Sequence, residues 1–295
     1  MKTKGWLIYE AEHAEKNIAF IEWFLTEAKE LDIELHFILQ NRISFGVKKN
    51  ELVLLLDDAP LMQAPSFVIM RNMDPLFNEQ LERMMIPCFN SYHVSAVCND
   101  KAKTHQYLAG KGIPMLDTYF TTSDELLTGT SPLPFPFVMK TRTGRGGGDV
   151  FMVENTEQLE QVYTKLSARS IILQPLAGSP GKDLRVYVLG RDVVGAVLRS
   201  NQKSFKANFT LGGQAEAYEL NKSELTVVNK IINQFDFGLV GIDFLFDEDG
   251  GLLFNEIEDV VGCRTLCLTS DINIVKRYLE FILQKLSKPS GGEHI

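Results

Sequence analysis

The sequence has 295 residues, of which 45% are hydrophobic and 23% charged, and it carries a formal net charge of −8. A chain of this length can bury a sizeable core and has room for one large domain or two to three small ones. The net negative charge argues against a nucleic-acid partner held by bulk electrostatics, because such a partner needs a basic face that displaces counterions.

The sequence also lacks the usual signals for a membrane, a secretory route or a cysteine-bound metal. No window approaches the roughly 20 apolar residues of a membrane span, and the first eight residues lack the apolar run of a signal peptide. The four cysteines, at positions 88, 98, 263 and 267, form no CxxC pair, so we expect neither a zinc site nor a disulfide framework. We therefore expect a cytoplasmic protein that has no membrane partner.

The first part of the chain has the pattern of an α/β domain, which we place at residues 1–95. An apolar run at 6–9, helical spacing over 17–31 and alternation over 33–39 predict a βαβ beginning. Further strands are expected at 52–56 and 66–70, followed by a helix over 74–85. Arg71 and Asn72 follow the last strand at its carboxyl end, where open α/β sheets bind ligands. They could hold a substrate carboxylate, or they could be a surface loop pair.

The remaining chain divides into two segments and a tail, at 96–178, 179–288 and 289–295. In the first segment Asp100 is a candidate cap for a helix that ends near residue 111. A linker rich in Thr, Ser, Gly and Pro is expected over 121–136. Strands and helices then alternate, with strands at 137–140, 149–153, 170–174, 184–189, 192–199, 240–246 and 251–257, and helices at 156–168, 222–235 and 271–286.

A glycine-rich stretch follows the apolar strand that ends in Lys140. It contains Gly144, Arg145, Gly146 and Gly147. Glycines let backbone N–H groups converge on phosphate oxygens, and the basic side chains supply the opposite charge. The spacing fits neither the Walker A pattern nor the dinucleotide-binding turn. It predicts a phosphate-binding flap between two antiparallel strands, with an ordinary hairpin loop as the alternative.

Three carboxylates lie on, or directly after, the two strands of the predicted hairpin at 240–257. Glu256 and Glu258 share a face because side chains alternate along a strand, and Asp243 can point to the same face from the neighbouring strand. Carboxylates so close repel one another unless a cation neutralises them, which indicates bound Mg²⁺. The alternative is an acidic, solvated edge strand.

In chain order, these features resemble the ATP-grasp superfamily, and within it the branch of RimK-like carboxylate-amine (glutamate) ligases. The resemblance spans about residues 90–266. It rests on Asp100-Lys101, on Leu-Ala-x-x-Gly-Ile-Pro at 108–114, and on the flap and the acidic hairpin. Three further segments contribute: Gln174-Pro175-Leu176, Asp183-x-Arg185 with Arg199, and Phe-Lys-Ala-Asn-x-x-x-Gly-Gly at 205–213.

The resemblance implies an α+β ATP-grasp fold, in which a Rossmann-like N-terminal domain precedes two α+β lobes that clamp ATP. It assigns the metal, Mg²⁺ or Mn²⁺, to Asp243, Glu256 and Glu258, and catalysis to Arg199, Lys206 and Asn208. It places ATP on the two lysines, the flap, the hinge and the Asp-x-Arg strand: Lys101, Lys140, Gly144, Arg145, Gly146, Gly147, Gln174, Pro175, Leu176, Asp183 and Arg185.

Three positions depart from the family pattern. Pro175 stands where the hinge normally has an acidic residue, which leaves Asp183 as the expected ribose contact. Glu258 replaces the usual Asn among the metal ligands. The stretch 259–265 replaces the customary Ser-Pro-Gly in a region that commonly faces the second substrate.

The implied reaction joins a small-molecule or peptide carboxylate to an amine through an acyl phosphate, with release of ADP and phosphate. Arg199, with Lys206, would stabilise the charge that develops on the transferred group. Two alternatives remain at this level: a kinase that uses the same fold on a hydroxyl, and a nucleotide-binding regulatory protein without turnover. A homodimer is the default expectation.

Overall fold

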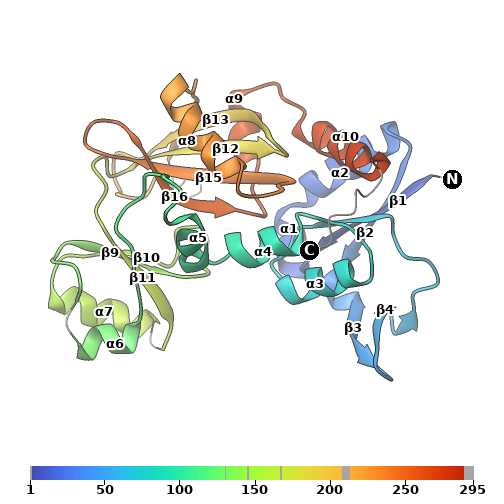
Figure 1. Cartoon of the computed structure of the whole chain (residues 1–295), viewed down its shortest axis with the longest axis horizontal. Helices are drawn as coiled ribbons and strands as arrows, with labels where there is room; N and C mark the ends of the chain where they lie inside the picture. Colours follow the sequence, from blue (N-terminus) through green and yellow to red (C-terminus); the bar gives the residue numbers. More distant parts are fainter. Residues whose placement is uncertain (1, 130, 145, 167, 208–212, 289–295) are drawn as a thin grey trace.

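The computed structural model describes residues 2–129, 131–144, 146–166, 168–207 and 213–288. Three parts, each built on its own main sheet, are arranged around the central helices α4 (Tyr92–Cys98) and α5 (Lys101–Leu108) (Figure 1). Among the helices of these ranges, none is both long and apolar enough to cross a membrane.

The N-terminal part is a parallel sheet covered by helices on both faces. Its order is β2 (Ile33–Leu39), β1 (Thr3–Tyr9), β6 (Phe67–Met70) and β7 (Cys88–Phe89). One face packs on α2 (Ile18–Glu30) and on the C-terminal helix α10 (Ile274–Ser287), the other on α3 (Pro75–Arg83). The short α1 (Ala11–Lys16) and η1 (Gln40–Arg42) follow β1 and β2. The predicted βαβ beginning is therefore confirmed.

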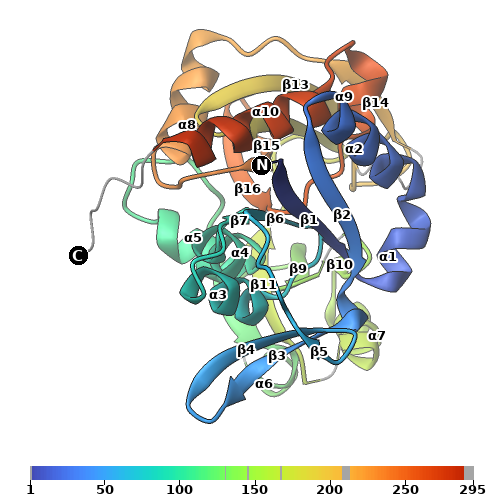
Figure 2. The same ribbon diagram turned by 90° about the vertical axis from the view of Figure 1, so that its right-hand side faces the viewer.

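A small antiparallel sheet extends from this part, at the bottom of Figure 2. It consists of β3 (Ile43–Lys48), β4 (Glu51–Leu56) and β5 (Ala59–Pro60). The strand predicted at 52–56 is β4, whereas its partner β3 was not predicted. Lys49 and Asn50 join the two strands with φ of 51° and 66°. Two positive φ values in a two-residue loop are typical of the tight turns that hairpins favour.

The second part is an antiparallel sheet with two helices on one side. Its order is β10 (Val150–Val153), β9 (Phe137–Thr141), β11 (Ser170–Pro175) and β8 (Tyr119–Thr122), with α6 (Ser123–Thr128) and α7 (Thr156–Leu166). The prediction of a linker over 121–136 was wrong at its beginning, where β8 ends and α6 forms. Thr122 and Glu125 make a reciprocal capping box there, a signal that the Thr- and Ser-rich composition concealed.

The third part is a five-stranded antiparallel sheet. Its order is β14 (Gln214–Ala217), β13 (Asp192–Ser200), β12 (Lys182–Leu189), β15 (Leu239–Phe246) and β16 (Leu252–Glu258). One face packs on α8 (Lys222–Ile232), and the other shares a core with α9 (Arg264–Thr269), α10 and the N-terminal sheet. The predicted domain boundary near residue 95 falls within α4, so the proposed division is not marked there by a break between elements.

Candidate active site

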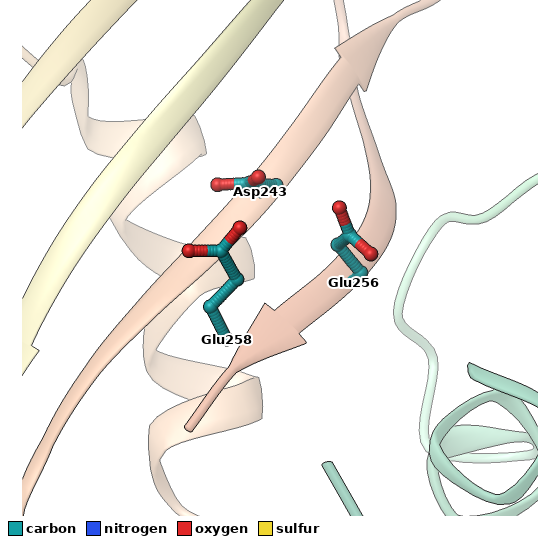
Figure 3. Close-up of side chains that lie close together, drawn as sticks. All are labelled: Asp243, Glu256 and Glu258. Atoms are coloured by element: carbon teal, nitrogen blue, oxygen red, sulfur yellow. The ribbon is translucent and has the colours of Figure 1, made fainter. Parts of the chain in front are cut away.

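The three predicted metal ligands converge on one face of the β15–β16 hairpin (Figure 3). Asp243 is paired with Glu256 across the ladder, and Glu258 lies two residues further along β16 on the same face. One oxygen from each carboxylate lies within 4.8 Å of those from the other two. The convergence predicted from strand alternation is confirmed.

Two buried arginines from the adjacent strands β12 and β13 hold these carboxylates. Arg185 donates from Nε and Nη2 to the two oxygens of Asp243, at 2.7 Å each, and its Nη2 lies 2.7 Å from Oε1 of Glu258. Arg199 Nη2 donates to Oδ2 of Asp243 at 2.8 Å. Burial alone would favour a neutral Asp243, but the two guanidinium groups hold its pKa well below the usual range.

Arg199 makes a second ion pair with Asp183, which its Nε and Nη2 contact at 2.5 and 2.9 Å. Burial raises the pKa of Asp183 to about 6, although the charge of Arg199 opposes the shift. If Asp183 binds the ribose, as the resemblance predicts, its carboxylate has to bind the ribose and Arg199 together.

The two predicted phosphate lysines lie on the other side of the cluster. Lys101 Nζ lies 2.9 Å from Oε2 of Glu256, and Lys140 Nζ donates to Oδ1 of Asn255 at 2.8 Å. Burial lowers the pKa of Lys140 to about 8. Four cations from lysine and arginine thus accompany the four carboxylates of the cluster. Basic side chains therefore already supply opposite charge to these carboxylates, for which the sequence predicted Mg²⁺ alone.

The carboxylates nevertheless fit a hard divalent cation. Each offers oxygen, the ligand that Mg²⁺ prefers, and a carboxylate has lone pairs left after accepting one or two hydrogen bonds. Glu256 and Glu258 also remain partly exposed, with side-chain exposures of 24% and 20%. Glu256 and Glu258 each line one of the two pockets described below, from which an ion can reach them.

A narrow first pocket, of about 90 Å³, lies between the second and third sheets. We call it the nucleotide pocket, after the ligand that the sequence predicts for the residues that line it. The flap covers it: Lys101 Nζ donates to Gly144 O at 2.5 Å, and Lys206 Nζ donates to Gly147 O at 2.7 Å. Gly146 and Gly147 have φ of 65° and 74°, which glycine adopts without strain. The predicted residues that line this pocket are Lys101, Lys140, Gly144, Gly146, Gly147, Gln174, Pro175, Leu176, Asp183, Arg199, Lys206 and Glu256.

A chain of hydrogen bonds fixes the orientation of Gln174 in this pocket. His105 Nδ1 contacts Lys101 O at 2.8 Å, so this nitrogen carries the proton and Nε2 is an acceptor. Burial lowers the pKa of His105 to about 4, which keeps the ring neutral. Gln174 Nε2 donates to His105 Nε2 at 3.2 Å and to Thr118 Oγ1 at 2.9 Å. Gln174 Oε1 is left buried without a donor among the described residues.

A second pocket of about 530 Å³ lies between the N-terminal part and the third sheet. We call it the acceptor pocket, because part of its wall is the stretch that the sequence predicts to face a second substrate. Its wall comes from the end of α1, the start of α2, Arg71 and the segment around α9. It shares Gly146 and Arg199 with the nucleotide pocket, so the two pockets meet beside the carboxylates. Arg185, which was predicted to contact ATP, lines the acceptor pocket instead.

Residues 259–265, the stretch predicted to face a second substrate, lie partly in the wall of the acceptor pocket and partly in the protein interior. Gly262, Cys263, Arg264 and Thr265 line the acceptor pocket. Asp259 is buried beneath it, where its Oδ1 accepts from Asn90 Nδ2 at 2.7 Å.

Several positions fall outside this arrangement. Asn72, named with Arg71 as a ligand contact, turns away from the acceptor pocket and donates to Gln40. Arg145 and Asn208 lie outside the described residues. Phe20 and Trp23, which line the acceptor pocket, were not predicted, because nothing in a helix pattern indicates which partly buried aromatic residues face a cavity.

Comparison with known proteins identifies the family. Residues 98–282, more than half of the chain, match the RimK-like ATP-grasp domain, so the chain belongs to the RimK-like ATP-grasp family. The uncharacterised protein MG011 of Mycoplasma genitalium is 27% identical over 291 residues, which cover 97% of this chain and 94% of that protein. Human N-acetylaspartylglutamate synthase A is 27% identical over 248 residues, which cover 79% of this chain but 63% of the human protein.

The fold agrees with a solved ligase. The ATP-grasp ligase PsnB, in complex with a phosphomimetic variant of its minimal precursor, Mg and ADP, has a TM-score of 0.69 at 15% identity. The match covers 98% of this chain and all of PsnB. The predicted ATP-grasp fold and RimK-like family are confirmed. The class predicted from the sequence, a ligase that forms C–N bonds, agrees with the named activities of these relatives.

Proposed function

We propose that this protein is an ATP-dependent ligase that joins a carboxylate to an amine and releases ADP and phosphate. The observation that carries the proposal is the meeting of the two pockets at Gly146 and Arg199, beside the three carboxylates. A nucleotide in the first pocket would present its terminal phosphate at this junction. A substrate in the second would reach that phosphate without passing through solvent.

Basic side chains would hold the nucleotide once the flap is raised. Lys101 and Lys206 now donate to flap carbonyls, and exchange of these carbonyls for phosphate oxygens would open the narrow pocket and place both charges on ATP. Lys140 adds a third cation from β9. Gln174 also lines this pocket, and its Oε1, which has no donor among the described residues, would accept from the 6-amino group of adenine.

Asp243, Glu256 and Glu258 would hold Mg²⁺. When bound, the ion supplies charge neutralisation for the phosphate oxygens of the nucleotide. The eight charges of the cluster already balance, so we expect Mg²⁺ and the negatively charged nucleotide to bind together.

The reaction proceeds in two steps by this proposal. A carboxylate oxygen of the substrate bonds to the γ-phosphorus as the bond to the β–γ bridging oxygen breaks, which gives an acyl phosphate and ADP. The amine then attacks the acyl carbon, phosphate leaves, and the amine loses a proton. Arg199 lies at the junction and would stabilise the charge on the transferred group in both steps. The chain needs no covalent nucleophile for this chemistry.

The finer assignments stay predictions. They are the use of Mn²⁺ in place of Mg²⁺, the homodimer, the cytoplasmic location, and the division at residues 95, 178 and 288. Small-molecule and peptide substrates are both consistent with the proposal.

The test is an assay with Mg·ATP and a panel of carboxylates and amines, in which ADP, free phosphate and product mass are followed together. The ligase is expected to release ADP and phosphate in equal amounts, and only when both an acid and an amine are present. A phosphorylated product without free phosphate would indicate a kinase. Nucleotide binding without any turnover across the panel would indicate a regulatory protein.

A further inference from the structure

Arg71 is a buried cation at the wall of the acceptor pocket, directly after β6. It is 8% exposed, and its Nη2 donates to Val261 O at 2.9 Å. Its Cζ lies 5.3 Å from the centre of the Phe20 ring and 6.0 Å from that of Tyr9. Arg71 Nε and Tyr9 Oη are both buried and make no hydrogen bond of good geometry within the part of the chain that the structure describes, although the Tyr9 hydroxyl lies close enough to interact with the guanidinium group.

Among the residues that the structure describes, Arg71 lacks the ion pair that Arg185 and Arg199 make. Arg185 and Arg199 in the same pocket are each paired with carboxylates, whereas Arg71 makes no ion pair with any described residue. A carbonyl and two aromatic faces offset only part of the cost of burying a guanidinium group. A carboxylate would supply both the opposite charge and an acceptor for Nε.

The composition of the acceptor pocket points to the same ligand. Among the described residues, Glu258 is the one acidic residue that lines it. Five cationic residues line it as well: Lys16, Arg71, Arg185, Arg199 and Arg264. Phe20 and Trp23 form an apolar wall beside Arg71. This combination suits an organic acid with an aliphatic body, because the rings can pack on methylene groups while the arginine binds the charged end.

We propose that Arg71 determines specificity by binding a carboxylate that takes no part in the reaction. This inference rests on the proposed ligase function, in which the reacting group lies at the junction of the pockets. The second carboxylate belongs to an amino-acid acceptor, whose amine reacts, or to a dicarboxylic donor, whose other carboxylate reacts. One buried N–H without an acceptor fits a carboxylate oxygen better than a phosphate, whose three oxygens require more donors.

The first test uses the unaltered protein. L-glutamate, L-aspartate and L-lysine are compared with their α-amides as acceptors, and dicarboxylic acids with their monoamides as donors, by ADP release and product mass. One acid is expected to exceed its amide in kcat/KM on the order of 10²-fold, because a site built for a charged hydrogen bond rejects a ligand that lacks it. A preference among the acceptors identifies the bound carboxylate as that of an amino acid. A preference among the donors identifies it as that of a dicarboxylic acid. An unaltered protein that uses acids and amides equally well would overturn the proposal.

Variants of Arg71 give the second test. Arg71→Met is expected to abolish the preference for the acid, mainly through KM, and Arg71→Lys to retain part of it. Arg191→Met is the matched control, since Arg191 also contacts a backbone carbonyl, at Ile232, but lines neither pocket. A full preference in Arg71→Met would contradict the proposal. If Arg71→Met fails to fold, the proposal is tested by Arg71→Lys and by the acid–amide comparison with the unaltered protein.

A binding measurement separates this inference from the ligase proposal. The sequence has two tryptophans, of which Trp6 is buried in the core and Trp23 lines the acceptor pocket. Trp23 fluorescence is therefore expected to change with the acid and not with its amide, and Trp23→Phe removes the signal. If no substrate pair releases ADP but this difference persists, the ligase proposal fails while the assignment of Arg71 stands.

Discussion

Lys101 Nζ lies 2.9 Å from Oε2 of Glu256, so a lysine expected to bind phosphate is paired with a carboxylate expected to bind a metal. The pair keeps both side chains in place, and each would change partner when ATP and Mg²⁺ enter. The same exchange applies to Lys206 and the carbonyl of Gly147. In the proposed function, ligand binding at this site is an exchange of ionic partners, and substitutions should affect the nucleotide and the metal differently.

The substitution Glu256→Gln should have opposite effects on the two ligands. Affinity for Mg·ADP is expected to fall by about 10–100-fold, as for the loss of other residues that support a bound metal. Affinity for ADP without Mg²⁺ is expected to stay the same or to rise, because Lys101 loses its carboxylate partner. Isothermal titration calorimetry with and without Mg²⁺ measures both. Asp249→Asn, at an exposed position in the turn of the same hairpin, is the control, and an equal loss with and without Mg²⁺ would contradict the metal assignment.

Nucleotide affinity should depend on pH through Lys140. Burial lowers the pKa of Lys140 to about 8, so the free protein loses this charge as the pH rises above that value. Bound phosphate favours the charged form, and affinity for ADP is therefore expected to fall above pH 8, by up to about tenfold per unit. The phosphates of ADP are already ionised there, since their last pKa is about 6. A titration series from pH 7 to 9.5 measures this, with Lys140→Arg expected to flatten the curve.

The lowered pKa of Lys140 also predicts how stability depends on pH. The effect is opposite to that on nucleotide affinity, because stability should increase as the pH rises. The pKa of Lys140 is lower in the folded protein than in the unfolded chain, so its buried charge destabilises the fold below pH 8. Its contribution to the free energy of unfolding should therefore become less unfavourable as the pH rises from about 8 towards the unfolded value of 10.5. Urea denaturation of the unaltered protein and of Lys140→Met across this range isolates the contribution.

Gln174 should distinguish adenine from hypoxanthine. Its Oε1 is an acceptor fixed by His105 and Thr118, and adenine has an amino group where hypoxanthine has a carbonyl. Gln174→Leu is expected to weaken ADP binding by about tenfold, the upper range for one neutral hydrogen bond, with little effect on IDP. Competition binding measures the ratio. Gln161→Leu on the exposed surface of α7 is the control.

Arg199 should contribute to turnover and to folding, and the two contributions are separable. Arg199→Met is expected to lower kcat by about 10² or more, as for other groups that stabilise a developing charge. It also leaves Asp183 without its arginine partner, at a cost of about 3 kcal/mol in the free energy of unfolding. In the double variant with Asp183→Asn, stability should recover in part while kcat stays low. Recovery of both would show that Arg199 is only structural.

The sequence predicted those parts of the site that depend on local patterns. Asp243 and Glu256 were placed together because an alternating hairpin with an acidic, glycine-containing turn defines its own register. The bond between Arg185 and Asp243 was not foreseen, since it depends on which strand neighbours β15 in the sheet. The acceptor pocket was hidden for a related reason: Phe20, Arg71 and Arg264 come from distant segments, and only the fold brings them together.

The two pockets draw on different stretches of the chain. All residues that line the nucleotide pocket come from position 101 onward, whereas the acceptor pocket also uses Arg71 and the beginning of α2. The described residues among the first hundred thus contribute to one wall of the acceptor pocket and to none of the nucleotide pocket. Exchange of the first hundred residues between relatives offers a direct way to redirect such a catalyst to a new partner while its use of ATP is preserved.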